Sequence, residues 1–474
     1  MLFNSLEFLA FLPIVFLLYW FVFRGRRWQN LLLLVASYVF YGWWDWRFLL
    51  LIALTSFSSF GSALLISRCR ERRWQRLVGM ANVVLNLCIL GLIKYYNFFV
   101  DNLNALLASM GYSLDWPSMY IILPVGISFY TFQALSYTID VYQGKLAPTR
   151  DPVAFFAYIS FFPQLVAGPI ERATNLLPQF QHNRSFRYDQ AVDGVRQMLW
   201  GFVKKVVVAD NCAVAVNQIW DSYAEASGSL LLLGALLFTF QIYCDFSGYS
   251  DIAIGCARLF GFNLMQNFRF PYFSRSISDF WRRWHSSLMT WFRDYVYIPL
   301  GGSRGSRLAT VRNTLLVFAL SGLWHGANWT FVTWGLYHAL LISVYVVLGR
   351  NSGRPAPSRL VAVFQVMLTF LLVLVGWVIF RSQSVAQAFD YLRRMCCSGS
   401  LFDVASVTMG KQALMWALLV MGFEWFQRNR QHALQLHVTG LWRFSVVRWT
   451  FYYALIAIML FYHGKQSEFI YFQF

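Results

Sequence analysis

The chain has 474 residues, of which 58% are hydrophobic and 13% are charged, and its formal net charge is +18. Soluble domains average about 25% charged residues, so this composition excludes a soluble protein and predicts a polytopic membrane protein. The arginines gather in short loops at 24–27 and 68–76, and no soluble basic domain is left to bind a nucleic acid. We therefore expect membrane lipid and no nucleic acid as a partner, with both loops on the cytoplasmic side.

Apolar stretches near the length of a membrane span recur along the chain and predict one all-α membrane domain over residues 1–474. The first stretch lacks a basic leader and an A-x-A cleavage site, so we expect a retained span. Segment 161–172 contains two prolines, and 313–324 is too short to cross alone. Such broken segments are tolerated where protein or a wet cavity surrounds them, which predicts a site between the helices. The predicted spans are 5–23, 30–44, 48–67, 78–99, 119–141, 153–170, 196–218, 229–246, 313–324, 327–348, 360–380, 412–426 and 446–463.

Residues 262–312 are too polar to span a membrane and are dense in arginine and tryptophan. Read as one helix over 276–297, the segment has an apolar stripe and a polar face, as an interfacial helix does. Asp279 and Arg283 are one turn apart and can form an ion pair. The stripe consists of Trp281, Trp284, Leu288, Trp291 and Tyr295, and the polar face of Asp279, Arg282, Arg283, Ser286, Thr290, Arg293 and Asp294.

The following apolar run is bounded by two basic loops, 302–312 and 349–359. If both loops are cytoplasmic, the run enters and returns as a hairpin with its turn near Trp324–Asn328. That placement puts His325 inside the protein. The same charge count places 427–448 on the cytoplasmic side and the tail, about 464–474, on the extracytoplasmic side.

A histidine at membrane depth is either a hydrogen-bonded packing residue or a functional group, because burying an ionisable side chain there is costly. Asn328 lies three residues after His325 and could orient its imidazole or bind a substrate. On one continuous helix, His325 and His338 would face about 140° apart and lie roughly 20 Å apart, so we expect no metal site. His285 could meet His325 only through tertiary folding; otherwise it is a polar residue among tryptophans.

Other residues set limits on the chemistry. There is no GxSxG nucleophile elbow, because the one string of that form, GGSRG at 301–305, lies in a basic loop, and there is no Walker A sequence. Both observations argue against a serine hydrolase and an ATP-driven transporter. The seven cysteines form no CxxC pair, and most of them are expected to be small buried apolar residues. Asp245 and Asp251 lie in an apolar run, as partners of nearby arginines or as the lining of a polar path.

Six stretches, taken together and in order, resemble the membrane-bound O-acyltransferase family, in particular its bacterial alginate O-acetylation branch. The resemblance implies a bundle of about eleven transmembrane helices, with re-entrant and interfacial helices around a tunnel through the membrane. The histidine of the family's WHG motif corresponds to His325, and that of its FWRRWH motif to His285. The stretches are NLLLLVASYVFYGWW (30–44), LPVGISFYTFQALSYTIDVYQG (123–144), FFPQLVAGPIER (161–172), YCDFSGYSDIAIG (243–255), SISDFWRRWHSSLMTWFRDYVYIPLGG (276–302) and LWHGANWTFVTWGLYH (323–338).

The resemblance further implies acyl transfer from a cytoplasmic thioester, with acetyl-CoA as the expected donor and with no bound cofactor. His325, His285 and Asn328 are then candidate catalytic residues, while Arg282, Arg283 and Arg293 are candidate contacts of an anionic donor, or membrane anchors. The C-terminal SEFIYFQF resembles the aromatic tail of a small helper protein of D-alanylation systems, in which a tyrosine is proposed to carry the acyl group. Tyr471 is accordingly an acyl carrier or, alternatively, an aromatic anchor at the interface.

The function expected from the resemblance is O-acetylation of an exported or cell-wall polysaccharide of the alginate, cellulose or peptidoglycan type. The protein is expected in the bacterial inner membrane, with a periplasmic SGNH-type or alginate-acetylase-like acetyltransferase as its partner. Two alternatives stay open: transfer of D-alanyl groups from a carrier-protein thioester, and non-enzymatic export of a polysaccharide or its precursor.

Overall fold

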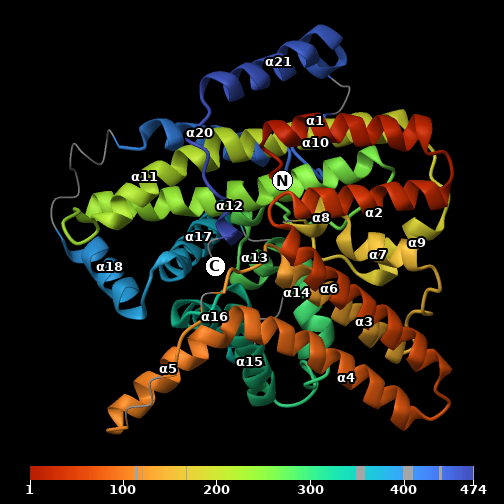
Figure 1. Ribbon diagram of the computed structural model, residues 1–474. Helices are drawn as coiled ribbons and strands as arrows, with labels where there is room; N and C mark the ends of the chain where they lie inside the picture. The colour runs from red at the N-terminus through yellow and green to blue at the C-terminus, as the bar shows by residue number, and fades with distance from the viewer. Residues whose placement is uncertain are drawn as a thin grey trace. The chain divides into compact units, whose positions relative to one another are not determined.

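The computed structural model describes residues 1–112, 116–119, 121–166, 168–348, 358–398, 409–436 and 440–472. In these ranges the regular elements are α-helices with short π- and 3₁₀-helical segments (Figure 1). The chain divides into two compact units, residues 1–192 with 256–265, and residues 193–255 with 266–474. The predicted all-α class is therefore confirmed for the described residues.

The first unit contains the helices of the N-terminal part of the chain. α3 and α4 form a hairpin that packs against α6, and the buried Thr138 hydroxyl donates to Asn82 Oδ1 at 2.9 Å in this contact. A polar pair of this kind gives two neighbouring helices a fixed register. The elements are α1 (Leu6–Leu17), α2 (Arg26–Gly42), α3 (Leu49–Arg68), α4 (Arg72–Leu90), α5 (Tyr96–Ser109), α6 (Ile127–Tyr142), α7 (Pro152–Ser160), α8 (Phe162–Leu165) and α9 (Ala173–Gln181).

The second unit holds the candidate site. Its first helices approach each other closely at glycines: a Cβ on Gly248 would lie 2.8 Å from the Gly201 carbonyl oxygen, and one on Gly255 would lie 2.3 Å from that of Gly194. Glycine allows the two helix backbones this contact. The elements are α10 (Tyr188–Phe202), a π-helix η4 (Val203–Ala209), α11 (Asp210–Asp221), α12 (Gly228–Leu259), α13 (Ile277–Arg283), α14 (Ser286–Phe292), η6 (Arg293–Tyr297), α15 (Arg307–His325), α16 (Trp329–Val347), α17 (Arg359–Arg381), α18 (Val385–Cys397), α20 (Lys411–Phe426) and α21 (Ser445–Phe461).

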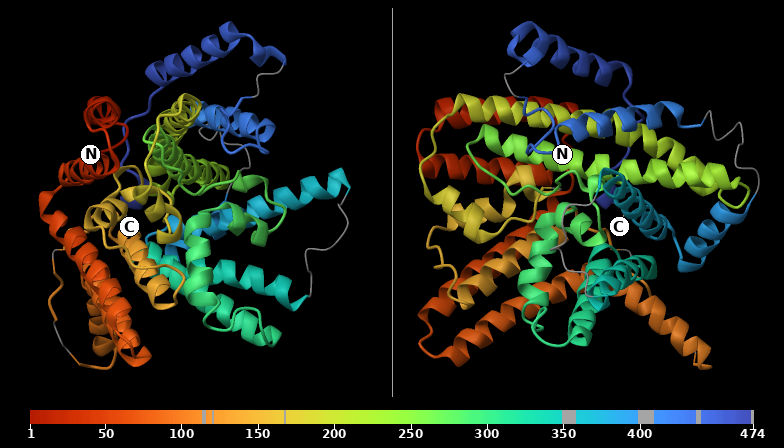
Figure 2. Two further views of the ribbon diagram at one scale, coloured as in Figure 1. Left: turned by 90° about the vertical axis from the view of Figure 1, so that its right-hand side faces the viewer. Right: turned by 180° about the vertical axis from the view of Figure 1, so that it is seen from behind.

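The predicted hairpin is present, and α15 and α16 lie side by side (Figure 2). α15 begins at Arg307, earlier than predicted, and ends at His325. The two helices touch backbone to backbone, because a Cβ on Gly322 would lie 2.2 Å from the Phe331 carbonyl oxygen and one on Gly335 would lie 2.1 Å from that of Phe318. His325 therefore occupies the tip of a closely packed pair. Residues 349–357 of the predicted loop after it lie outside the described residues.

The prediction of one helix over 276–297 is wrong. α13 ends at Arg283, His285 adopts the left-handed conformation with φ 45° and ψ 48°, and a new helix begins at Ser286. Tertiary hydrogen bonds cause the break: the Ser286 amide donates to the Asn267 carbonyl at 3.0 Å, and the His285 ring binds the Asn267 side chain. Trp281 and Trp284 of the predicted stripe are buried in the unit.

Five described helices are long and apolar enough to cross a membrane, judged by length and composition. They agree with the predicted spans at 48–67, 78–99, 229–246, 327–348 and 360–380. Their ranges are Trp46–Arg68, Arg72–Ser109, Gly228–Leu259, Trp329–Val347 and Arg359–Arg381, and shorter apolar helices lie at Leu6–Val22, Pro152–Leu165 and Ser445–Phe461.

Candidate active site

His325 is the last residue of α15 and is 3% exposed. Its Nδ1 lies 2.6 Å from the Ser321 carbonyl oxygen. A carbonyl oxygen only accepts hydrogen bonds, so Nδ1 carries the proton and Nε2 is the basic atom of the ring. Trp324 and Trp334 pack edge-on against the imidazole with centroids 5.0 and 4.9 Å away. The predicted histidine is thus an oriented base in an aromatic environment.

His285 is brought to the same place by the break between α13 and α14, and it is 1% exposed. Its Nδ1 lies 3.0 Å from Asn267 Oδ1, an atom that also accepts from the Ser287 hydroxyl at 2.9 Å. Burial, and next the nearby His325, lower the pKa of His285 well below its ordinary value. The imidazole is therefore neutral at neutral pH, with Nε2 as its basic atom.

Tyr471 lies next to both histidines. Its ring centroid is 5.8 Å from that of His325 and 6.3 Å from that of His285. Phe246 of α12 supports this arrangement, with centroids 4.4 Å from Tyr471 and 4.7 Å from His285. Burial raises the pKa of Tyr471, so its phenol is protonated at neutral pH. Three residues that sequence motifs single out at 285, 325 and 471 are thus gathered in one apolar site.

Asn328 occupies a different position from the one that its predicted role requires. Its Oδ1 accepts the Thr330 amide at 3.0 Å, which caps α16, and its Nδ2 donates to the Gln383 carbonyl at 3.0 Å. Both ends of the side-chain amide are therefore engaged in holding the hairpin turn. A catalytic role of Asn328 stays a prediction, whereas its capping role is visible.

The three arginines predicted to contact the donor lie in two different places. Arg282 and Arg283 line a cavity of about 510 Å³, and the predicted pair between Arg283 Nε and Asp279 is present at 3.0 Å. Arg293 instead is exposed and pairs with Asp294 at 2.8 Å. Sequence reasoning missed three further arginines of the cavity, because they come from distant segments. The lining consists of Gln266, Arg269, Phe270, Asp279, Arg282, Arg283, Arg428, Asn429, Arg430, Gln431 and Gln435.

The cavity adjoins the histidine site through residues 266 and 267. Gln266 lines the cavity, and its carbonyl accepts the Ser286 hydroxyl at 2.6 Å. Asn267, the next residue, holds His285. A molecule bound by the arginines would therefore lie beside the segment that positions one of the two imidazoles.

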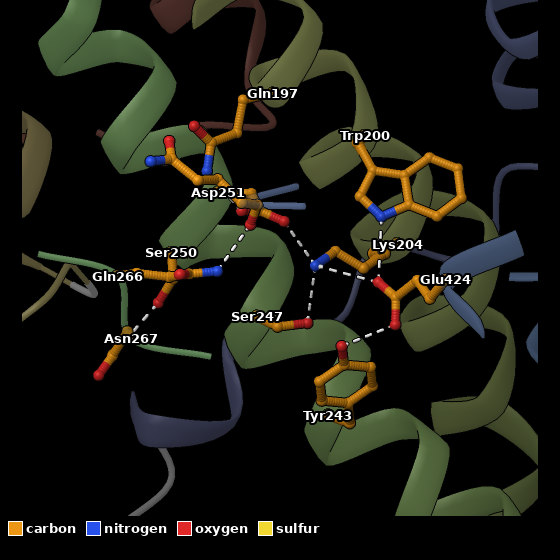
Figure 3. A network of polar contacts seen from close by, with 11 residues as sticks. Gln197, Trp200, Lys204, Tyr243, Ser247, Ser250, Asp251, Gln266, Asn267 and Glu424 are labelled. Atoms are coloured by element: carbon orange, nitrogen blue, oxygen red, sulfur yellow. Dashed lines mark hydrogen bonds and ion pairs between the residues drawn. The ribbon is translucent and has the colours of Figure 1, made fainter. Parts of the chain in front are cut away.

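A buried lysine network, shown in Figure 3, was also missed. Lys204 Nζ lies 2.6 Å from Asp251 and 3.8 Å from Glu424, and it donates to the Ser247 hydroxyl at 2.9 Å. Glu424 accepts further hydrogen bonds from Trp200 at 3.1 Å and Tyr243 at 2.7 Å. The expected arginine partner of Asp251 is thus a lysine. The signal in the sequence was the pair Lys204–Lys205 inside an apolar run, where each charge needs a buried partner.

Comparison with known proteins identifies the family. Residues 146–381 match the membrane-bound O-acyltransferase family. The chain is 44% identical over 403 residues to the probable alginate O-acetylase AlgI of Pseudomonas aeruginosa, covering 84% of this chain and 76% of that protein. It is 34% identical over 425 residues to a peptidoglycan O-acetyltransferase of Helicobacter pylori, covering 83% and 80%. A teichoic acid D-alanyltransferase of Bacillus subtilis is 29% identical over 273 residues, covering 54% and 68%.

These similarities decide between the classes of function that the sequence left open. A family of acyltransferases sets aside the non-enzymatic exporter, and the helices long enough to span a membrane agree with a multi-pass protein. The chain belongs to the membrane-bound O-acyltransferase family.

Proposed function

We propose that the protein transfers acetyl groups from a cytoplasmic thioester, acetyl-CoA, for the O-acetylation of an exported or cell-wall polysaccharide. The observation that carries the proposal is the meeting of the two buried histidines, His285 and His325, with the partly buried Tyr471 in one site. Two oriented neutral imidazoles beside a hydroxyl are the components that acyl transfer to oxygen requires. The relatives named for acetylation of alginate and of peptidoglycan support this choice of acyl group and acceptor class.

In the proposed reaction, the Tyr471 oxygen attacks the carbonyl carbon of the thioester. An ester C–O bond forms, the C–S bond breaks, and coenzyme A leaves as a thiol. His325 Nε2 takes the phenol proton and gives it to the departing sulfur, while His285 Nε2 offers a second acceptor beside the same ring. The surrounding tryptophan and phenylalanine rings keep water from the thioester. The acetyl ester on Tyr471 then passes to a second hydroxyl.

The arginine-lined cavity is the proposed site for the anionic part of the donor. Arg269, Arg282, Arg283, Arg428 and Arg430 line it together with a single carboxylate, Asp279. Guanidinium groups bind phosphate through paired hydrogen bonds as well as through charge. A coenzyme A bound there would direct its thioester along residues 266–267 toward His285. Arg293, predicted as a donor contact, lies outside this lining.

The later steps require a protein outside the cell membrane. We propose a bacterial inner-membrane location and a periplasmic partner of the SGNH or alginate-acetylase type, which takes the acetyl group from Tyr471. A tunnel through the bundle would connect the cytoplasmic donor with this partner. The C-terminal tail carries the accepting hydroxyl and is therefore the expected point of contact with the partner.

The test is incubation of purified protein with radiolabelled acetyl-CoA. We expect label on the wild-type chain, and none on His325→Ala or Tyr471→Phe. Phe469→Tyr in the Tyr471→Phe background controls for the position of the hydroxyl, because residue 469 packs against Tyr249 and lies two residues before the proposed carrier. Label that persists in Tyr471→Phe, or its absence from folded wild type, would overturn the tyrosine relay. Labelling only by a D-alanyl carrier-protein thioester would instead favour the activity named for the Bacillus subtilis relative.

A further inference from the structure

The C-terminal tail, residues 462–471, is laid along the helices of the second unit. The Asn211 side chain donates to the Tyr462 carbonyl at 2.8 Å, and the Gly464 amide donates to the Val206 carbonyl at 3.2 Å. Gly464 touches the helix backbone: a Cβ there would lie 2.7 Å from both the Asn211 nitrogen and the Asp210 carbonyl carbon. The tail thus leaves α21 and runs in direct contact with η4 and α11.

Further along, the tail meets a second buried charge cluster. Lys205 Nζ lies 2.8 Å from Asp210 Oδ1 and 2.9 Å from Asp245 Oδ1, and the three side chains are at most 3% exposed. The same ammonium donates to the Ser467 carbonyl at 3.0 Å, and the Ser467 hydroxyl donates to Asp210 at 2.5 Å. The Ile470 amide donates to Asp245 Oδ2 at 2.8 Å.

We propose that Lys205, Asp210 and Asp245 form a clasp that positions the tail so that Tyr471 faces the two histidines. One ammonium accompanies two carboxylates, so the buried cluster carries excess acceptors. Donors from the tail at Ser467 and Ile470 satisfy them, and an undocked tail would leave buried carboxylates without those hydrogen bonds. Ile470 directly precedes Tyr471, so the hydrogen bond at Ile470 holds the backbone next to the tyrosine in place.

The neighbouring lysine supplies a matched control. Lys204 is similarly buried and also pairs with two carboxylates, Asp251 of α12 and Glu424 of α20. Its hydrogen bond to Ser247 goes to α12, whereas Lys205 donates to the tail. Replacing either lysine by methionine removes one buried charge from a similar environment. The clasp predicts that the two replacements differ in their effect on the tail.

The first measurement is amide hydrogen exchange of the tail peptide in the intact protein, without donor. We expect the tail amides to exchange rapidly in Lys205→Met and in Gly464→Ala. The added methyl group of Gly464→Ala pushes the tail away from α11 without leaving a buried charge unpaired. In Lys204→Met we expect the tail to keep the protection of the wild type. If Lys205→Met fails to fold, Gly464→Ala and Ser467→Ala decide the question. Unchanged protection in the folded variants, or equal loss in Lys204→Met, would overturn the clasp.

The second measurement is the rate of labelling of Tyr471 at several acetyl-CoA concentrations, and it rests on the proposed function. We expect Gly464→Ala to lower the maximal rate about tenfold or more with half-saturation unchanged, because positioning is lost and donor binding is kept. A lowered rate with a protected tail would contradict positioning as the cause. If the exchange results hold while wild type takes no label, the clasp stands and the proposed relay fails.

Discussion

The conformation of His285 decides which residues can replace it. A non-glycine residue at φ 45° is uncommon, and asparagine and glycine are the residues that adopt this region most readily. Residue 285 must therefore adopt a left-handed backbone conformation and also carry a neutral imidazole. A substitution can separate them, because asparagine accepts the backbone and lacks the ring.

We predict that His285→Asn keeps the fold and loses most acetyl transfer, while His285→Ala loses transfer and also about 1 kcal/mol of stability through left-handed strain. The lowered pKa adds a pH dependence. Below the ordinary histidine pKa near 6.5, residue 285 is protonated in the unfolded chain but stays neutral in the folded protein. The free energy of unfolding therefore decreases as the pH is lowered, by up to about 1.4 kcal/mol per pH unit.

Thermal unfolding at pH 7.5 and at pH 5.5 measures both effects. We expect wild type to lose more stability than His285→Asn on acidification, and the two to respond alike above pH 7. An identical acid response in the two proteins would show that His285 is not the group that resists the proton.

At the scale of elements, the site depends on the contact between α15 and α16. Gly322 and Gly335 bring the two backbones together, and the aromatic residues of α16 then pack on His325. A shift of the hairpin by one methyl group would move the imidazole relative to Tyr471. A misplacement of about 1 Å between reacting groups can lower the rate of the chemical step by about a hundredfold.

Gly335→Ala should therefore lower both the unfolding temperature and the rate of labelling. Gly422 of α20 is the control, since a Cβ there meets nothing within 4 Å and alanine favours the helix by about 1 kcal/mol. Unfolding temperatures of the two variants, measured side by side, test the prediction. Equal temperatures would mean that the hairpin adjusts without cost.

At the scale of the whole molecule, sequence motifs predicted His285, His325 and Tyr471, because each belongs to a local pattern. The hairpin turn was predicted from charge, because two basic loops bound its apolar run. The break at His285 was missed because Asn267, eighteen residues away, holds it through hydrogen bonds. Periodicity reports only what neighbours in the sequence prefer.

The arginine cavity shows the same limit, since its lining comes from residues 266–270, α13 and residues 428–435. We predict that Arg282→Gln and Arg430→Gln each raise the acetyl-CoA concentration for half-maximal labelling severalfold, and more together, with the maximal rate unchanged. Arg393→Gln is the control because Arg393 is 69% exposed and pairs with Asp390 on α18. Labelling curves at two salt concentrations test it, and an effect of equal size in the control would contradict a specific donor site.

Under the proposed relay, the docked tail would also fix the stoichiometry of the reaction. The proposed carrier is part of the polypeptide, so its local concentration near the histidines does not depend on how much protein is present. Because each chain has one such tyrosine, it would hold one acetyl group at a time. Supplied with donor alone, such an enzyme would release a single equivalent of coenzyme A and stop. Continuous turnover would then require both this membrane protein and its proposed periplasmic partner, and the rate at which the partner unloads Tyr471 would set the overall rate.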